Sequence, residues 1–149
     1  MKNQLSIKQI FISHARNDYA LANALTKELR SRGFNVWDDK NIKKTKNWSF
    51  QIEKALKNSD AMIALLNQHS YSSSYVRDEL EYALFSEDYK NRLLPVFIES
   101  SKGTNFNRLP WVLTNLEYLR ISETKSLDSM ANIIANKFIA FLRNKESDR

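Results

Sequence analysis

The chain has 149 residues, a formal net charge of +6, two glycines and no cysteine. This length suits one domain, and the lack of cysteine excludes disulfides and thiolate zinc sites and favours a reducing, cytoplasmic location. Because Gly33 and Gly103 are far apart, the chain has neither a P-loop nor the glycine motif of dinucleotide-binding folds, both of which need several clustered glycines.

Short apolar runs alternate with helical patterns along the chain. Leu21, Leu25 and Leu29, for example, define one face of a helix that Asp18 is expected to cap and Gly33 to end. In chain order, the patterns predict a strand at 7–13, a helix at 18–32, a strand at 34–37, a basic loop at 38–47, a helix at 48–57, a strand at 61–66, a helix at 75–86, a strand at 93–98, a helical turn at 111–116, a strand at 117–121 and a helix at 127–143.

This alternation predicts an α/β fold in which helices cover both faces of a parallel sheet. Five strands favour the flavodoxin-like order 2-1-3-4-5. Pro95 cannot donate a backbone hydrogen bond, so we expect it near a strand end or at the sheet edge. Residues 1–149 are expected to form a single domain, with a core over about 7–143 and a charged C-terminal tail.

Ligands of such sheets bind beyond the carboxyl ends of the strands, where the winding reverses. Here that point lies between the first and third predicted strands. Ser13 ends the first strand, His14 and Arg16 follow it, and Ser74 is expected to cap the helix at 75–86. We therefore expect these side chains to meet at one crevice.

Several α/β chemistries do not fit the residues at this crevice. A phospho-acceptor receiver needs acidic residues where this chain has Ser13 and Leu66, and the chain has no G-x-S-x-G nucleophile elbow. His14 and His69 lack a placed carboxylate, so no metal site is expected. Basic residues are spread along the chain and no apolar run is long enough to span a bilayer, so we expect neither a nucleic-acid nor a membrane partner.

A carboxylate on the helix at 75–86 is the remaining candidate. At about 100° per residue, Glu79 lies nearest the apolar face, roughly 85° from its centre, whereas Asp78 and Glu81 point toward solvent. Tyr75 lies one turn earlier on the same stripe. A half-buried Glu79 could bind sugar hydroxyls and stabilise positive charge on a ribosyl ring; the alternative is an ordinary boundary glutamate.

An ordered set of residues, taken together, resembles the TIR (Toll/interleukin-1 receptor) domains, and in particular the bacterial NAD-cleaving kind. The similarity covers roughly residues 7–100, and the remainder fits the last strand and helix of that family. The residues that carry it are Phe11-Ile12-Ser13-His14, Asp18, Gly33-Phe34-Asn35-Val36-Trp37-Asp38, Ile42, Trp48, Ser59-Asp60, Ser70, Ser74-Tyr75-Val76 and Glu79-Leu80.

The resemblance implies a flavodoxin-like enzyme that cleaves the nicotinamide–ribose bond of NAD+, with NAD+ as substrate and no cofactor. The family's catalytic glutamate follows an aromatic residue, usually Trp, by four positions; Glu79 and Tyr75 occupy these places. The substrate-binding residues so implied are Ser13, His14, Arg16, Asp38, Lys43, Ser74 and Tyr75. ADP-ribose, a cyclic isomer and a base-exchange product all remain open.

The resemblance also implies partners. Residues 38–47 correspond to the BB loop, which in the family gates the pocket and joins subunits, so a homo-oligomer is implied; Lys44 and Thr45 stand where a glycine is common. By family analogy, a lone TIR module makes a nucleotide signal for a separate effector protein in bacterial antiphage defence. The alternatives are a non-catalytic adaptor or scaffold and an effector that interferes with host TIR signalling.

Overall fold

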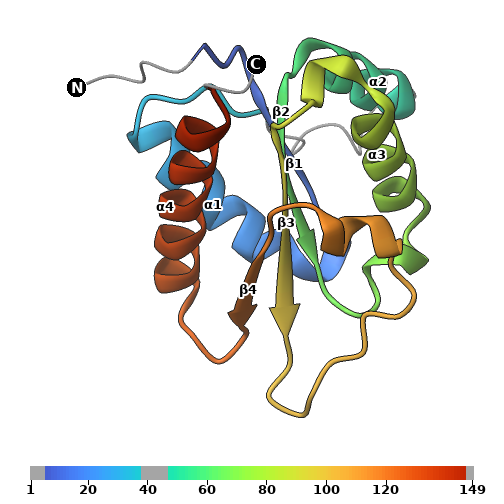
Figure 1. The fold of residues 1–149 in the computed structure, drawn as a ribbon, viewed down its shortest axis with the longest axis vertical. Helices are drawn as coiled ribbons and strands as arrows, with labels where there is room; N and C mark the ends of the chain where they lie inside the picture. Colours follow the sequence, from blue (N-terminus) through green and yellow to red (C-terminus); the bar gives the residue numbers. More distant parts are fainter. Residues whose placement is uncertain (1–5, 38–46, 147–149) are drawn as a thin grey trace.

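A parallel sheet lies at the centre of the computed structural model, which describes residues 6–37 and 47–146 (Figure 1). Within those residues the sheet has four strands in the order β1-β2-β3-β4. Apolar side chains fill both faces of the inner strands, as is typical of a parallel sheet between helices. The strands are β1 (Ile10–Ser13), β2 (Ala61–Leu66), β3 (Leu93–Glu99) and β4 (Leu119–Ser122).

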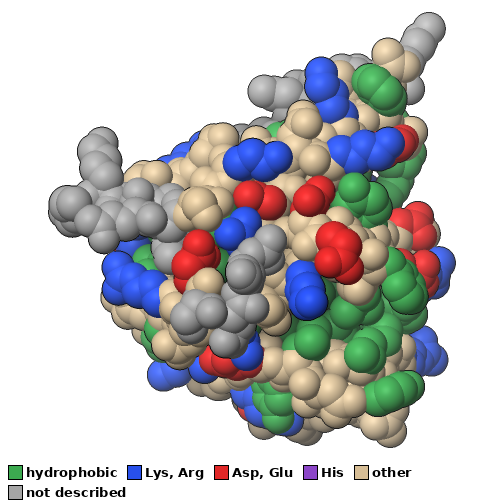
Figure 2. Space-filling model, turned by 45° about the horizontal axis from the view of Figure 1, so that its top comes forward, with side chains coloured by type: hydrophobic (Ala, Val, Ile, Leu, Met, Phe, Trp, Pro, Cys, Tyr) green, Lys and Arg blue, Asp and Glu red, His purple; other side chains and the backbone are tan. Residues whose placement is uncertain are grey.

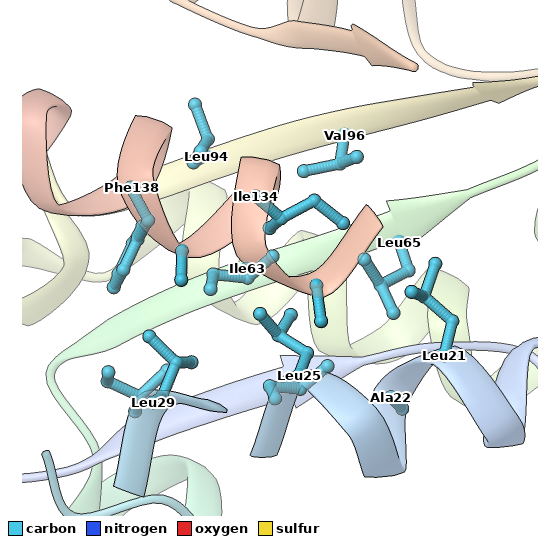
Figure 3. Packing of buried hydrophobic residues seen from close by; sticks show 14 of the residues in the cluster. Leu21, Ala22, Leu25, Leu29, Ile63, Leu65, Leu94, Val96, Ile134 and Phe138 are labelled. Atoms are coloured by element: carbon cyan, nitrogen blue, oxygen red, sulfur yellow. The ribbon is translucent and has the colours of Figure 1, made fainter. Parts of the chain in front are cut away.

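Two pairs of helices cover the two faces of the sheet (Figure 1). On one face lie α1 (Tyr19–Ser31) and α4 (Leu127–Glu146), and Figure 3 shows leucines of α1 packed with Ile134 and Phe138 against strand residues such as Ile63 and Leu65. On the other face lie α2 (Trp48–Asn58) and α3 (Ser74–Phe85). The described residues also form four short 3-10 helices: η1 (Arg16–Asp18), η3 (Ser70–Ser72), η4 (Glu87–Tyr89) and η5 (Trp111–Asn115). Within residues 6–37 and 47–146, no helix is both long and apolar enough to cross a lipid bilayer.

The prediction of five strands is wrong for the described residues. The segment 34–37 contributes one isolated parallel bridge, between Val36 and Ile10. Two backbone bonds make this bridge: the amide of Ile10 donates to the carbonyl of Asn35 at 2.8 Å, and the amide of Trp37 donates to the carbonyl of Ile10 at 3.0 Å. One residue pair fixes the segment at the edge of the sheet, but a strand needs a continuous series of such pairs. The sheet of the described residues therefore has four strands.

Pro95 lies near the amino end of its strand, which was one of the two predicted placements, but not at the sheet edge. It is the third residue of β3, which is an inner strand, and it lies opposite Ala64 of β2. On the other side, β4 pairs with β3 only from Val96 onward. Pro95 therefore comes before the part of β3 that pairs with β4, and its missing amide hydrogen removes no hydrogen bond from that pairing.

A buried ion pair ties the strands together at their amino ends. Arg92, just before β3, donates from Nη1 to Oδ2 of Asp60 at 3.1 Å, and both side chains are nearly inaccessible. Oδ1 of the same aspartate accepts the backbone amides of Lys8 and Gln9 at 2.9 and 3.2 Å. One carboxylate thus joins the chain segments that lead into β1, β2 and β3.

The turns at the carboxyl ends of β1 and β2 are joined by a second carboxylate. Asn67 donates from Nδ2 to Oδ2 of Asp18 at 2.7 Å, and its backbone amide donates to Oγ of Ser70 at 2.7 Å. Asp18 stands at the N-cap position of α1 but makes no side-chain cap bond there, contrary to the expected capping role. Burial raises its pKa, with a smaller opposing effect from the bond to Asn67.

Replacing Asp60 with Ala is expected to lower the free energy of unfolding by about 3–5 kcal/mol, because Arg92 then loses its buried counter-charge and keeps only a longer pair, of 3.6 Å, with the more exposed Glu146. Urea denaturation measures the change. Glu53→Ala is the control, since it breaks an exposed pair with Lys57 on α2 and should change little. Equal effects of the two substitutions would show that the buried pair does not hold the strands.

Replacing Asp18 with Asn is expected to raise the free energy of unfolding at pH 7. The folded protein binds the proton of Asp18 more tightly than the unfolded chain, so ionisation above the folded pKa costs stability. Asn removes that cost, and its amide oxygen can still accept from Asn67. The gain should shrink as the pH falls below the folded pKa and vanish below the unfolded pKa, because the wild-type carboxyl is then protonated in both states.

Thermal denaturation of Asp18→Asn, measured from pH 7 down into the acid range where carboxyl groups are protonated, checks the expectation. Asp78→Asn, an exposed residue of α3, is the control. A loss of stability at pH 7, or a gain that grows toward acid, would contradict it.

Candidate active site

A buried carboxylate lies at the carboxyl end of β1. Glu79, on α3, is 7% exposed, and its Oε1 accepts a hydrogen bond of 2.6 Å from the hydroxyl of Ser13. Ser13 is the last residue of β1 and is fully buried. These two residues are 66 positions apart in the chain, so only the fold brings them together. A carboxylate at this depth needs such hydrogen-bonding partners to offset the water that it has lost.

The start of α3 explains why Glu79 points inward. Ser73 is the N-cap, with extended dihedral angles, and its hydroxyl accepts from the amide of Val76 at 3.4 Å. Val76 and Leu80 then face the sheet, and Glu79 lies beside that face rather than opposite it. The predicted cap, Ser74, is already the first helical residue and is exposed, so the predicted cap is wrong by one position.

A surface groove of about 490 Å³ lies between α2 and α3 and reaches Glu79. Tyr75 stands in its wall with 47% of its surface exposed, and the ring of Trp48 meets it edge to face at 4.9 Å between centroids. The lining is mainly aromatic and aliphatic, with acidic groups among it. The lining residues are Trp48, Ser49, Ile52, Glu53, Leu56, Lys57, Ser74, Tyr75, Asp78, Glu79 and Tyr82.

Four of the predicted site residues thus meet at one place: Ser13, Ser74, Tyr75 and Glu79. Side chains along a strand point alternately to its two sides, so His14, which follows Ser13, points away from these four residues. His14 faces α1, where it lines a small cavity with Tyr19 and Thr26, and its Nδ1 lies 2.9 Å from the carbonyl oxygen of Ala15.

The remaining predicted residues lie away from the groove or beyond the described part. Arg16 belongs to η1 and is exposed. Asp38 and Lys43 fall outside the described residues, as does nearly all of the predicted loop 38–47.

Three residues near the site, Trp48, Asn67 and Asp18, were not among the predicted site residues. Trp48 forms the aromatic pair with Tyr75, and Asn67 joins Asp18 across the two strand ends. The sequence does carry a signal for the second contact, because both residues follow parallel strands that end at the same edge of the sheet. The packing of Trp48 depends on how α2 lies against α3, for which one sequence offers no signal.

The surface shows no concentration of one charge on the face drawn in Figure 2. Lys and Arg side chains are interspersed with Asp and Glu side chains there, and hydrophobic side chains gather on the side that carries α2 and α3. Within 6–37 and 47–146, no three His, Cys, Asp or Glu side chains are grouped so that they could hold a metal ion. The groove therefore offers a buried carboxylate beside aromatic rings as its main chemical feature.

A family model described as "TIR domain" matches residues 10–134. Among solved structures, the chain is similar to a metazoan TIR-STING receptor from C. gigas in complex with 2',3'-cGAMP, with a TM-score of 0.63 and 19% identity. That match covers 91% of this chain but only 41% of the receptor's chain. Comparison with curated protein sequences gives no significant match.

The chain is also similar to a CheY-like response regulator receiver domain from Methanospirillum hungatei JF-1, with a TM-score of 0.52 and 12% identity over 91% of this chain and 96% of the other. At these identities both structural similarities concern the fold alone. Ser13 and Leu66 end the strands that would carry the acidic residues of a receiver, so the shared fold does not bring that chemistry. The family model spans most of the chain, and the chain therefore belongs to the TIR domain family.

Proposed function

We propose that this TIR domain cleaves the nicotinamide–ribose bond of NAD+, with Glu79 as its catalytic carboxylate. The observation that carries the proposal is the position of that carboxylate. It is buried at the carboxyl end of β1, accepts a hydrogen bond from Ser13, and reaches a groove that Tyr75 lines. An ionisable group that is buried at the edge of a cleft is a candidate for a functional residue.

The chemistry of the bond suits a site with one carboxylate. Nicotinamide leaves C1′ of NAD+ as a neutral molecule from a cationic one, so its departure needs no proton donor. The ribosyl group that remains resembles an oxocarbenium ion, as in glycoside hydrolysis. Glu79 would accept hydrogen bonds from the ribose hydroxyls and offset the positive charge that develops on the ring. Water as nucleophile then gives ADP-ribose, and an internal nucleophile gives a cyclic isomer.

The groove supplies a surface for the flat and apolar parts of the substrate. In this proposal the ring of Tyr75, which meets Trp48 edge to face, packs on the ribose or the nicotinamide, and Ser74 lies beside them. Arg16 or Lys43 meets the diphosphate, for which a guanidinium or ammonium group is suited.

Of the two remaining residues that the family resemblance implies for substrate binding, the proposal keeps one and leaves out the other. Asp38 stays in the proposed set on the family resemblance. His14 faces α1, and a direct contact with the ribose is not part of the proposal.

The wider role that we propose follows the family. The enzyme would act in the cytoplasm as a homo-oligomer joined through the loop 38–47, and would make a nucleotide signal for a separate effector protein in antiphage defence. The main alternatives are a non-catalytic adaptor or scaffold and an effector that interferes with host TIR signalling. Neither alternative requires a carboxylate buried at the edge of a groove, which is why the enzymatic function is preferred.

Replacing Glu79 with Gln is expected to lower the rate of NAD+ cleavage by about 100-fold or more, because the amide cannot offset the developing charge. Chromatography with mass spectrometry measures NAD+ loss and identifies the product. Glu81→Gln is the matched control, since it makes the same chemical change on an exposed residue of α3 and should leave the rate unchanged.

Two results would count against the proposal in different ways. Cleavage that persists in Glu79→Gln would show that another residue supplies the carboxylate. No cleavage by the wild-type chain, even at high protein concentration with crowding agents to promote assembly, would favour the adaptor.

Replacing Tyr75 with Ala is expected to lower kcat/KM by about tenfold, because a ring that stacks on a flat ligand contributes about 1–3 kcal/mol. Tyr75→Trp should retain or exceed the wild-type value, since indole offers a larger face. Steady-state kinetics with NAD+ measure both. Phe50→Ala, which removes an exposed ring of α2 outside the groove, is the control. A Tyr75→Ala enzyme with wild-type kcat/KM would exclude a stacking role.

A further inference from the structure

We propose that Ser13 is a positioning residue, whose hydroxyl orients the carboxylate of Glu79 and keeps it ionised for the reaction. This inference rests on the proposed NAD+ cleavage and deepens it. It also changes the role of Ser13, which the family resemblance placed among the substrate-binding residues. The observation behind it is the 2.6 Å hydrogen bond from Oγ of Ser13 to Oε1 of Glu79.

Burial excludes Ser13 from contact with the substrate in this conformation. Its exposed fraction is 0%, and it is absent from the lining of the groove that Glu79 reaches. Its backbone lies in β1, paired with Ala64 of the inner strand β2. A strand residue paired in this way has little freedom, so its hydroxyl is held by the sheet rather than by a loop. Ser13 can therefore act on the reaction only through Glu79.

The hydrogen bond has the length expected for a hydroxyl that donates to an ionised carboxylate, about 2.5–2.7 Å. A donor to the charged form favours that form, which opposes the tendency of burial to protonate the acid. The same bond restricts rotation of the carboxylate about its terminal torsion. Both effects serve a step in which negative charge must face a ribosyl ring that becomes positive.

The consequences appear in turnover and in pH dependence rather than in substrate affinity. Ser13→Ala is expected to lower kcat by about tenfold or more, since hydrogen bonds to charged groups are among the stronger ones in proteins. KM should stay within about twofold of the wild-type value, because no substrate contact is lost. The acid limb of the kcat/KM profile should move to higher pH, because the carboxylate of the variant is protonated more easily.

Ser13→Thr is the conservative variant. It keeps the hydroxyl on a residue type that suits a strand, and it should recover most of the activity and the wild-type pH profile. If the added methyl group prevents folding, Ser13→Cys replaces it as a variant of similar size with a weaker donor, and it should fall between serine and alanine. A purely structural role for Ser13 would lower the melting temperature of Ser13→Ala without moving the pH profile.

A measurement that does not depend on activity separates the failure of this inference from the failure of the proposed function. Carbon-13 NMR of the side-chain carboxyl groups follows the titration of Glu79, whose signal is assigned by its loss in Glu79→Gln. The midpoint is expected to move to higher pH in Ser13→Ala. An unchanged midpoint together with unchanged kcat would overturn the positioning role and leave NAD+ cleavage standing. A wild-type chain that does not cleave NAD+ would overturn the proposed function instead, whatever the titration shows.

Discussion

One buried hydrogen bond, from Ser13 at the end of β1 to Glu79 on α3, is the contact on which the candidate site depends. It joins the sheet to the helix that borders the groove, across 66 positions of sequence. A carboxylate buried without donors would cost several kcal/mol or would protonate. The rigid sheet supplies a donor at the required place, and the helix can then present an acid at the groove.

The two ends of the sheet use buried carboxylates differently. At the amino ends of the strands, Asp60 is enclosed by Arg92 and two backbone amides and holds three chain segments together. At the carboxyl ends, Glu79 is bonded to a neutral hydroxyl and reaches a groove. Asp60 is enclosed among its partners, whereas Glu79 stands where a ligand in the groove can reach it. This contrast agrees with the general rule that open α/β sheets bind ligands at the carboxyl ends of their strands.

Sequence reasoning succeeded where one element's own pattern decides the structure. The strand at 61–66 matches β2 residue for residue, because all six side chains are apolar and all are buried. Glu79 was predicted to be only half-buried from its angle on the helix, and its deeper burial depends on Ser13, a distant partner that no local pattern reveals. The cap of α3 was misplaced because Ser73 and Ser74 are chemically alike, and only the backbone angles distinguish them.

Other differences have equally specific causes. His14 could have been assigned to the opposite face from Ser13, because Ile10 and Ile12 share its side of the strand whereas Phe11 shares the side of Ser13. The expected second strand has the composition of a strand, yet only Val36 forms a bridge with β1. Pairing is a property of two segments, so composition alone could not predict how far it extends.

The central claim is that the carboxylate of Glu79 faces the ribose of NAD+. A crystal structure with a carbocyclic NAD+ analogue tests it most directly, because a methylene in place of the ribose ring oxygen prevents cleavage while the hydroxyls remain. If Glu79 acts on the ribose, electron density for the sugar is expected in the α2–α3 groove, with C1′ about 3–3.5 Å from a carboxylate oxygen of Glu79. An analogue bound elsewhere on the chain, without contact to the carboxylate of Glu79, would show that this residue does not act on the ribose.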